Sequence, residues 1–111
     1  MTESDVVLTP LPQADGTTKN RPAIFLREMP PFKDLLVCGV SSQLRKEVKG
    51  FDELISPGDT DFAASGLIKE SLIRLGFLAV LPRTRIIGVI GSISTGRHRL
   101  LLERLSIYLM K

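Results

Sequence analysis

The sequence has few of the side chains on which most familiar sites depend. Its 111 residues include one cysteine, one histidine and no tryptophan. A single cysteine excludes an intrachain disulfide and a thiolate metal cluster, and the position of Cys38 inside an apolar run predicts a buried, inert thiol. A single histidine excludes the two-histidine acid–base pair that some ribonucleases use. Aromatic residues make up 5% of the chain, so no base-stacking platform of the RRM type is indicated.

Motifs for nucleotide and metal chemistry are also missing. There is no Walker loop, no glycine-rich dinucleotide turn and no His-Glu-x-x-His sequence. Four acidic residues near a Pro-Gly turn lack the spacing of a metal loop, and we interpret them as solvated loop charges: Asp52, Glu53, Asp59 and Asp61. His98 stands between two arginines at a predicted helix start and is interpreted as a surface residue. We therefore expect neither a metal nor a cofactor.

Hydrophobic runs are short and the charge is modest. The most apolar region, residues 67–93, is interrupted by charged residues and does not supply the ~20 apolar residues of a membrane span. The first residues lack the segments of a signal peptide, so we expect a cytoplasmic protein with no membrane partner. A composition of 43% hydrophobic and 24% charged residues predicts one globular domain over residues 1–111. The net charge of +3 is compatible with a polyanionic partner but does not establish one.

Most of the chain has the pattern of short β-strands. Strands are predicted over residues 5–11, 23–28, 35–41, 51–55, 70–75 and 85–93, with a polar loop over 13–20 and either a helical turn or a strand edge over 43–49. Residues 77–81 either continue the fifth strand through a bulge or bend at Gly76 or begin a new piece. Gly88 and Gly91 in the last run indicate curvature or close backbone approach.

The C-terminal segment changes to a helical period. From residue 96 to residue 110, apolar side chains fall on one arc and polar side chains on the opposite one. Either Ser94 or Thr95 can serve as the N-cap. Leu100 and Ile107 widen the apolar arc, which fits a second contact such as another subunit. The whole pattern predicts a small, strongly bent, mostly antiparallel β structure with one C-terminal helix.

Two candidate site residues follow from the order of the strands. Arg21 stands just before the second strand and Ser41 ends the third, so a hairpin of these strands brings both residues to the same end. A guanidinium binds phosphate in a bidentate manner and stays charged at any working pH. RNA carries its own nucleophile, the 2′-hydroxyl, so its cleavage needs in-line geometry, charge stabilisation and proton transfer but no metal. From the residues alone, a plain surface arginine remains an open alternative.

Four stretches of the sequence, taken in their order, resemble one protein family. DVVLTPLPQADGTTKNRPAIFL, LLVCGVSSQ, SGLIKESLIRLGFLAVLP and IIGVIGSIS, followed by the closing helix, are similar to the MazF/PemK family of toxins from bacterial toxin–antitoxin pairs. The resemblance implies an SH3-like β barrel of the CcdB/PemK type with a C-terminal helix, assembled as a homodimer. It also implies a metal-independent, sequence-selective endoribonuclease that a cognate antitoxin neutralises. Such an enzyme cleaves single-stranded RNA (mRNA) to leave a 2′,3′-cyclic phosphate and a 5′-hydroxyl.

The resemblance also implies roles for individual residues. The catalytic arginine of the family falls on Arg21, just before Pro22, and its threonine or serine falls on Ser41, which would hold the scissile phosphate. The loop over residues 13–20 would border the RNA groove and move when RNA or antitoxin binds. Further substrate contacts are expected from Lys19, Asn20, Ser42, Gln43 and Arg45.

A second class of function exists on the same fold, that of a non-cleaving binding protein such as a DNA gyrase poison. Gyrase poisons of this fold act chiefly through residues at the end of the C-terminal helix. This chain ends in Ile-Tyr-Leu-Met-Lys, which offers little for that role, whereas Arg21 and Ser41 are present. The sequence therefore favours the nuclease.

Overall fold

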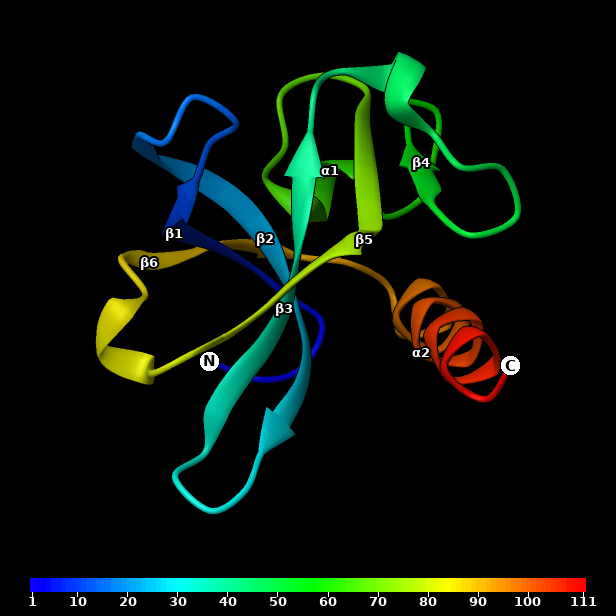
Figure 1. Ribbon diagram of the computed structural model, residues 1–111. Coiled ribbons are helices and arrows are strands. Elements are labelled where there is room, and N and C mark those ends of the chain that lie inside the picture. Colours follow the sequence, from blue (N-terminus) through cyan, green and yellow to red (C-terminus); the bar gives the residue numbers. More distant parts are fainter.

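The computed structural model describes residues 1–111 as one curled, fully antiparallel sheet with a C-terminal helix. The elements are β1 (Asp5–Pro12), β2 (Thr18–Met29), β3 (Asp34–Ser41), η1 (Leu44–Lys46), β4 (Glu53–Ile55), α1 (Phe62–Ser65), β5 (Ser71–Leu81), η2 (Arg83–Arg85), β6 (Gly88–Ser92) and α2 (Thr95–Leu109). The strand order is β4-β5-β3-β2-β1-β6, and the edge strands β4 and β6 do not pair with each other (Figure 1). The sheet is thus a half-barrel, and the predicted mostly-β fold with a C-terminal helix is confirmed.

Apolar side chains pack on both faces of the sheet, because successive side chains of a strand point to opposite faces. One cluster joins the sheet to α2, whose buried residues are Leu101 and Leu105. The other fills the opposite face between β1, β2 and β3. Cys38 is fully buried in the first cluster, and this burial raises the pKa of its thiol to about 12, so the prediction of an inert thiol is confirmed.

A bulge bends the sheet where β3 pairs with β5. Gly39 of β3 pairs with Arg74 of β5, while the preceding Cys38 pairs with Leu78, so residues 75–77 have no partner. Register shifts also interrupt the β1–β6 and β2–β3 pairs. Bulges increase local twist and bend the strand that carries them. β5 is therefore one strand continued through a bulge, the first of the two predicted alternatives.

Direct backbone contact between α1 and β6 closes the open side of the half-barrel. A Cβ atom on Gly91 would lie 2.2 Å from the carbonyl oxygen of Ala64. Gly66 ends α1 with φ of 75°, and a Cβ atom there would lie 2.1 Å from the carbonyl oxygen of Ile90. Glycine is required at both positions because the two backbones touch. The predicted close approach is confirmed at Gly91.

The loop between β1 and β2 is shorter than predicted. Lys19 and Asn20 were expected in this loop, but both are residues of β2. The loop closes early because the backbone amide of Gln13 donates to the carbonyl of Thr17 at 2.7 Å. Thr17 also donates its hydroxyl and its amide to the carboxylate of Asp15, at 2.6 and 2.9 Å, and these bonds lower the pKa of Asp15. Only five residues, 13–17, therefore separate the end of β1 from the start of β2.

Short 3₁₀ turns lie in two segments: residues 43–49, for which the sequence left two alternatives, and residues 85–93, for which it predicted a strand. Within residues 43–49, η1 confirms the helical-turn alternative. Within residues 85–93, the strand β6 begins only at Gly88, because η2 uses Arg85 and the chain then turns onto β1. Both turns end in basic residues.

The helix α2 begins as its sequence indicates but uses its histidine differently. The N-cap is Ser94, whose hydroxyl accepts a hydrogen bond from the backbone amide of Arg97 at 3.1 Å. The interpretation of His98 as a surface residue is wrong, because its Nε2 lies 2.7 Å from the carbonyl oxygen of Leu26 in β2 and donates to it. This bond ties the first turn of α2 to the sheet. No helix of the structure has the length and apolar character needed to cross a bilayer.

The acidic cluster forms a partly buried ion network around Arg97. The guanidinium contacts Asp61 at 2.9 Å, Asp59 at 2.9 Å and Glu53 at 3.1 Å, and 11% of the Arg97 side chain is exposed. Asp52 is 4% exposed and accepts hydrogen bonds from two backbone amides. The interpretation of these residues as solvated loop charges is wrong, because the counter-charge comes from α2, far along the chain.

This network predicts that acid destabilises the fold through Asp61. The hydrogen bond from Arg97 lowers the pKa of the Asp61 carboxyl although burial opposes it. A carboxyl with a lowered folded-state pKa stabilises the fold fully above its unfolded pKa of ~3.9, and the contribution disappears as the pH falls through the folded pKa. We expect Asp61→Asn to reduce the free energy of unfolding by roughly 2 kcal/mol at pH 7.

Urea unfolding between pH 7 and pH 3 measures this contribution. The difference between the native protein and Asp61→Asn should shrink below about pH 4. Glu103→Gln, which removes an exposed carboxylate paired with Arg99 on α2, is the control and should change stability by less than about 0.5 kcal/mol. A difference for Asp61→Asn that stays constant over the whole pH range would contradict the account.

Candidate functional site

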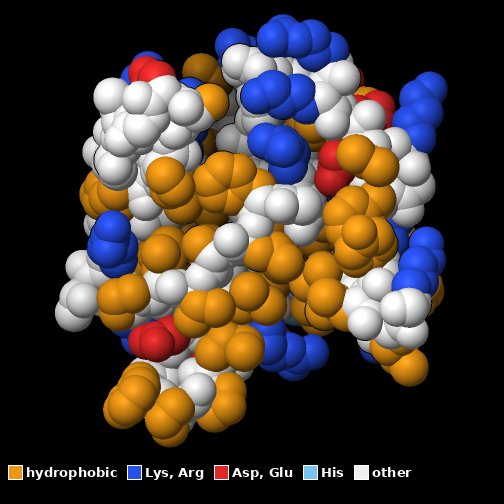
Figure 2. All heavy atoms as spheres, in the orientation of Figure 1, with side chains coloured by type: hydrophobic (Ala, Val, Ile, Leu, Met, Phe, Trp, Pro, Cys, Tyr) orange, Lys and Arg blue, Asp and Glu red, His pale blue; other side chains and the backbone are white.

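A groove of about 470 Å³ opens between the β1–β2 loop and η1. Its floor includes the apolar side chains of Leu11 and Phe77, and its basic residues come from β2, η1 and β5. None of the lining residues is acidic. Figure 2 shows Lys and Arg side chains gathered beside a hollow at the top of the molecule. The groove is thus suited to an anionic ligand that also carries apolar parts.

The strand register brings Arg21 and Ser41 together. Ala23 of β2 pairs with Gly39 of β3, and Arg21 and Ser41 each lie two residues beyond that pair. Continuation of an antiparallel register places such residues opposite each other on one face of the sheet. Both residues are half-buried, and both line the groove. They therefore lie at the same end of the hairpin, as the strand order predicts.

The Arg21 guanidinium has a neutral partner. Its Nη2 donates to Oε1 of Gln13 at 2.8 Å, and Nε2 of Gln13 donates in turn to the carbonyls of Leu11 and Pro12 at 3.1 and 3.2 Å. Arg21 takes part in none of the ion pairs of the structure. Its positive charge is therefore not neutralised inside the protein. An anion that replaces Gln13 gains a charge-assisted hydrogen bond.

The end of β3 presents Ser41 and Gln43 to the groove, whereas Ser42 between them is exposed and does not line it. The hydroxyl oxygen of Ser41 accepts a hydrogen bond from the backbone amide of Gln43 at 3.0 Å. This bond orients the hydroxyl and leaves its hydrogen available as a donor.

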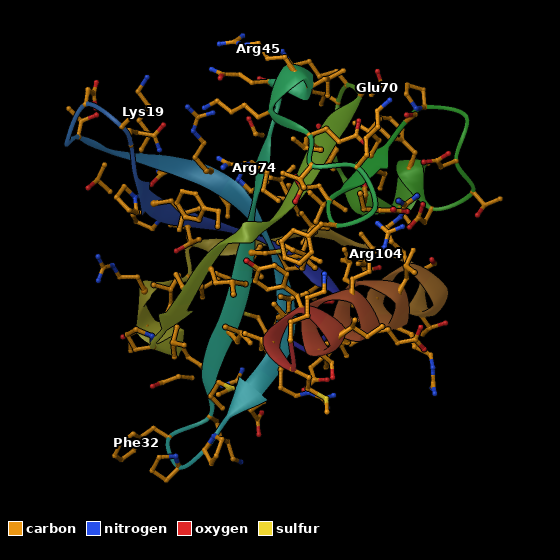
Figure 3. The ribbon with its side chains drawn as sticks, turned by 45° about the vertical axis from the view of Figure 1, so that its right-hand side comes forward. Lys19, Phe32, Arg45, Glu70, Arg74 and Arg104 are labelled. Carbon is orange, nitrogen blue, oxygen red and sulfur yellow. The ribbon has the colours of Figure 1, made fainter.

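The other three predicted contact residues lie outside the groove lining. Lys19 and Asn20 are exposed residues of β2 that pair with Leu11 and Pro10. Because alternate strand residues share a face, Lys19 is on the face of Arg21 and Asn20 is on the opposite face. Arg45 is exposed on η1. Figure 3 shows Lys19 at the upper left and Arg45 at the top of the molecule, with Arg74 below Arg45 and nearer the centre.

Two basic residues of the groove, Arg74 and Lys46, were not predicted from the sequence. Arg74 is half-buried and pairs with Gly39 across the β3–β5 ladder. It is the only charged residue of β5, and a lone cation in an otherwise apolar strand is the signal that could have identified it. Lys46 follows Arg45 on η1. Lys46 lines the groove and Arg45 does not, because of the direction in which this turn runs. With Arg21, the groove has three cations from three different elements.

Comparison with known proteins gives the family. Residues 2–109 match the family described as PemK-like, MazF-like toxin of type II toxin-antitoxin system. The chain belongs to this family. Its fold is similar to that of the Mycobacterium tuberculosis toxin MazF-mt6, with a TM-score of 0.69 and 18% sequence identity over 96% of each chain. A comparison with curated protein sequences found no match.

Membership of the MazF/PemK family has two consequences for this chain. Type II toxins act together with a cognate antitoxin, so a protein antitoxin is a partner of this chain. The toxins of the family are known as endoribonucleases. A groove that has basic residues and no acidic ones agrees with this activity. The resemblance found from the ordered sequence stretches is thereby confirmed.

Beside its candidate arginine, this MazF/PemK toxin buries an unpaired hydroxyl. Thr9 of β1 pairs with Arg21 of β2 and is 0% exposed, and its Oγ1 has no hydrogen-bond partner. A buried polar group without a partner costs folding free energy, because it loses its hydrogen bonds to water.

Thr9→Val replaces this hydroxyl by a methyl group of similar size. We expect the variant to be more stable by about 1 kcal/mol, since it removes an unsatisfied group from the interior. The urea midpoint of unfolding measures the change. Thr60→Val, at an exposed loop position, is the matched control and should leave the midpoint unchanged. A lower midpoint for Thr9→Val would show that the hydroxyl has a partner in solution.

Proposed function

We propose that this toxin is a metal-independent endoribonuclease that cleaves single-stranded RNA. The proposal rests on one observation: Arg21, with only a neutral partner, lies at the same end of the β2–β3 hairpin as Ser41, in a groove without acidic residues. A phosphodiester chain is the ligand whose charge such a groove complements. Membership of the MazF/PemK family supports cleavage rather than binding alone.

In the proposed reaction, RNA supplies the nucleophile and the protein stabilises charge. The 2′-oxygen of one nucleotide attacks the adjacent phosphorus and loses its proton, a P–O2′ bond forms, and the P–O5′ bond breaks. The leaving 5′-oxygen takes up a proton, so the products are a 2′,3′-cyclic phosphate and a 5′-hydroxyl. Arg21 leaves Gln13 and donates to the phosphoryl oxygens as negative charge develops on them, and Ser41 donates its hydroxyl hydrogen to the same group.

The remaining groove residues would hold the RNA on either side of that phosphate. Arg74 and Lys46 supply positive charge for neighbouring phosphates, and Gln43 supplies an amide for a base or a sugar. RNA that extends past the groove would meet the exposed residues at its rim. Contacts with this outer part of the RNA remain predicted for Lys19, Asn20, Ser42 and Arg45.

We further propose how the antitoxin inactivates this toxin. An acidic segment with apolar anchors fits a groove that has cations on its walls and apolar residues on its floor. Such a segment folds as it binds and excludes RNA from Arg21. We propose a cytoplasmic location, where both mRNA and a protein antitoxin are synthesised.

Removal of the Arg21 guanidinium tests the proposal. We expect Arg21→Ala to cleave more slowly by roughly 10²–10³, the loss found when one transition-state donor is removed. Its fold should persist because Arg21 lies outside both apolar clusters. The assay follows a mixed single-stranded RNA in excess EDTA. The control is Arg99→Ala on the exposed face of α2, which should cleave at the native rate.

The native protein must give discrete fragments in this assay while Arg21→Ala does not. Native protein that is folded by circular dichroism but leaves the RNA intact in EDTA would contradict the proposal. Equal cleavage by the native protein and Arg21→Ala would instead point to a contaminating nuclease.

We propose that the toxin is a homodimer that buries the end of α2. The last residues of the helix are apolar and exposed: Ile107, Tyr108, Leu109 and Met110. Figure 2 shows hydrophobic side chains spread across the middle and lower part of this face, away from the basic end. Leu36 and Leu102 line a hollow beside this helix end. A large exposed apolar area of this kind is typical of an interface.

Light scattering after gel filtration measures the predicted dimer. The native protein should have twice the chain mass of 12.2 kDa, and Leu109→Glu should shift it towards the monomer because a carboxylate then enters the apolar contact. Lys69→Glu, which places a carboxylate at an exposed loop position outside this hollow, is the control and should keep the native mass. A native protein that is monomeric at micromolar concentration would contradict the dimer.

A further inference from the structure

Phe77 places an aromatic ring in the floor of the groove. It belongs to the bulge of β5 formed by residues 75–77, which have no partner in β3. Its ring lies against Gly39, where a Cβ atom would be 3.3 Å from the ring atoms Cγ and Cδ1. The bulge therefore directs the ring onto β3, and the missing side chain at Gly39 leaves space for it.

The Phe77 ring is partly covered by apolar neighbours and partly open to the groove. Phe77 packs against the apolar cluster of β1, β2 and β3, but it is only half-buried and lines the groove. The guanidinium carbon of Arg74 lies 6.0 Å from the ring centroid, at the outer limit of a cation–π contact. A guanidinium held this loosely can move to a phosphate while a flat ligand takes its place on the ring.

The ring lies next to the candidate phosphate site. Gly39, which the ring contacts, precedes Ser41 by two residues in β3. At the rise of a strand, this separation is about 7 Å. A phosphate held by Arg21 and Ser41 would therefore have both an aromatic ring and a second guanidinium beside it in the groove.

We propose that Phe77 and Arg74 form a base-binding subsite, in which a nucleobase next to the scissile phosphate stacks on Phe77 while Arg74 binds the following phosphate. This inference rests on the proposed RNA cleavage and adds a substrate contact to it. Any base can stack on an aromatic face, because every base has a flat π-face. Stacking removes this face of the base and the Phe77 ring from contact with water. The subsite would position the nucleotide beside the reacting phosphate and leave the choice of base to other residues.

Binding of three matched RNAs to the native protein and to Phe77→Leu tests the subsite. All three RNAs carry a 2′-O-methyl group at the mapped cleavage position, so that they bind without being cleaved. One is complete, and each of the other two lacks the base on one side of the scissile phosphate. We expect Phe77→Leu to bind the complete RNA about tenfold more weakly than the native protein does, and to bind one of the abasic RNAs as well as the native protein.

Further variants separate stacking from a structural role of Phe77. Phe77→Tyr keeps the ring and should bind all three RNAs as the native protein does. Phe77→Met fills similar space without a ring and should repeat the Phe77→Leu result, which covers the case in which leucine impairs folding. The control is Phe32→Leu at the tip of the β2–β3 hairpin, 79% exposed and at the opposite end of the molecule from Arg45 in Figure 3.

Two results would overturn the inference. One is a loss of affinity for Phe77→Leu and Phe77→Met that is equal on complete and both abasic RNAs, because the ring then acts only through the fold. The other is unchanged affinity on every RNA. Failure of the proposed function itself would be seen separately, as native protein that does not cleave the unmodified RNA.

Discussion

The structure depends on the register of β3 with its two neighbours. Gly39 pairs with Ala23 of β2 on one side and with Arg74 of β5 on the other. The first pair fixes Arg21 opposite Ser41, and the second brings Arg74 into the same groove. A one-residue slip would turn these side chains to the other face of the sheet, where the cluster packed under α2 lies. The backbone ladder thus sets where the side chains of the candidate site lie.

Two arginines show how partners decide what a cation does. Arg97 forms ion pairs with three carboxylates and joins α2 to β4 and the loop after it. Its positive charge is neutralised within the protein. Arg21 has only the amide oxygen of Gln13 and faces a groove without acidic residues. Neither residue type nor local sequence distinguishes them. The difference comes from the elements that each arginine meets in the fold.

The sequence predicted the elements that rest on local patterns and missed those that rest on distant partners. The apolar runs of β1, β2 and β3 and the helical period of α2 appear in the structure, as does the shared end of Arg21 and Ser41. The acidic cluster was misread because Arg97 lies more than thirty residues away from Asp61 and Asp59. Arg74 was missed because its place in the groove depends on its pairing with Gly39 of β3. Phe77 was missed because a bulge, which the pattern left as one of two alternatives, directs it to the groove.

The central claim is that the RNA provides the nucleophile and the groove provides the charge. The most direct measurement uses two oligonucleotides that differ by one oxygen, the 2′-hydroxyl of the nucleotide 5′ to the mapped cleavage bond. The account predicts that the 2′-deoxy oligonucleotide binds the native protein with similar affinity but is not cleaved at that bond, while the unmodified RNA yields a cyclic phosphate end. Cleavage of the 2′-deoxy oligonucleotide at the same bond would contradict the account, because the attacking oxygen would then come from water or from the protein.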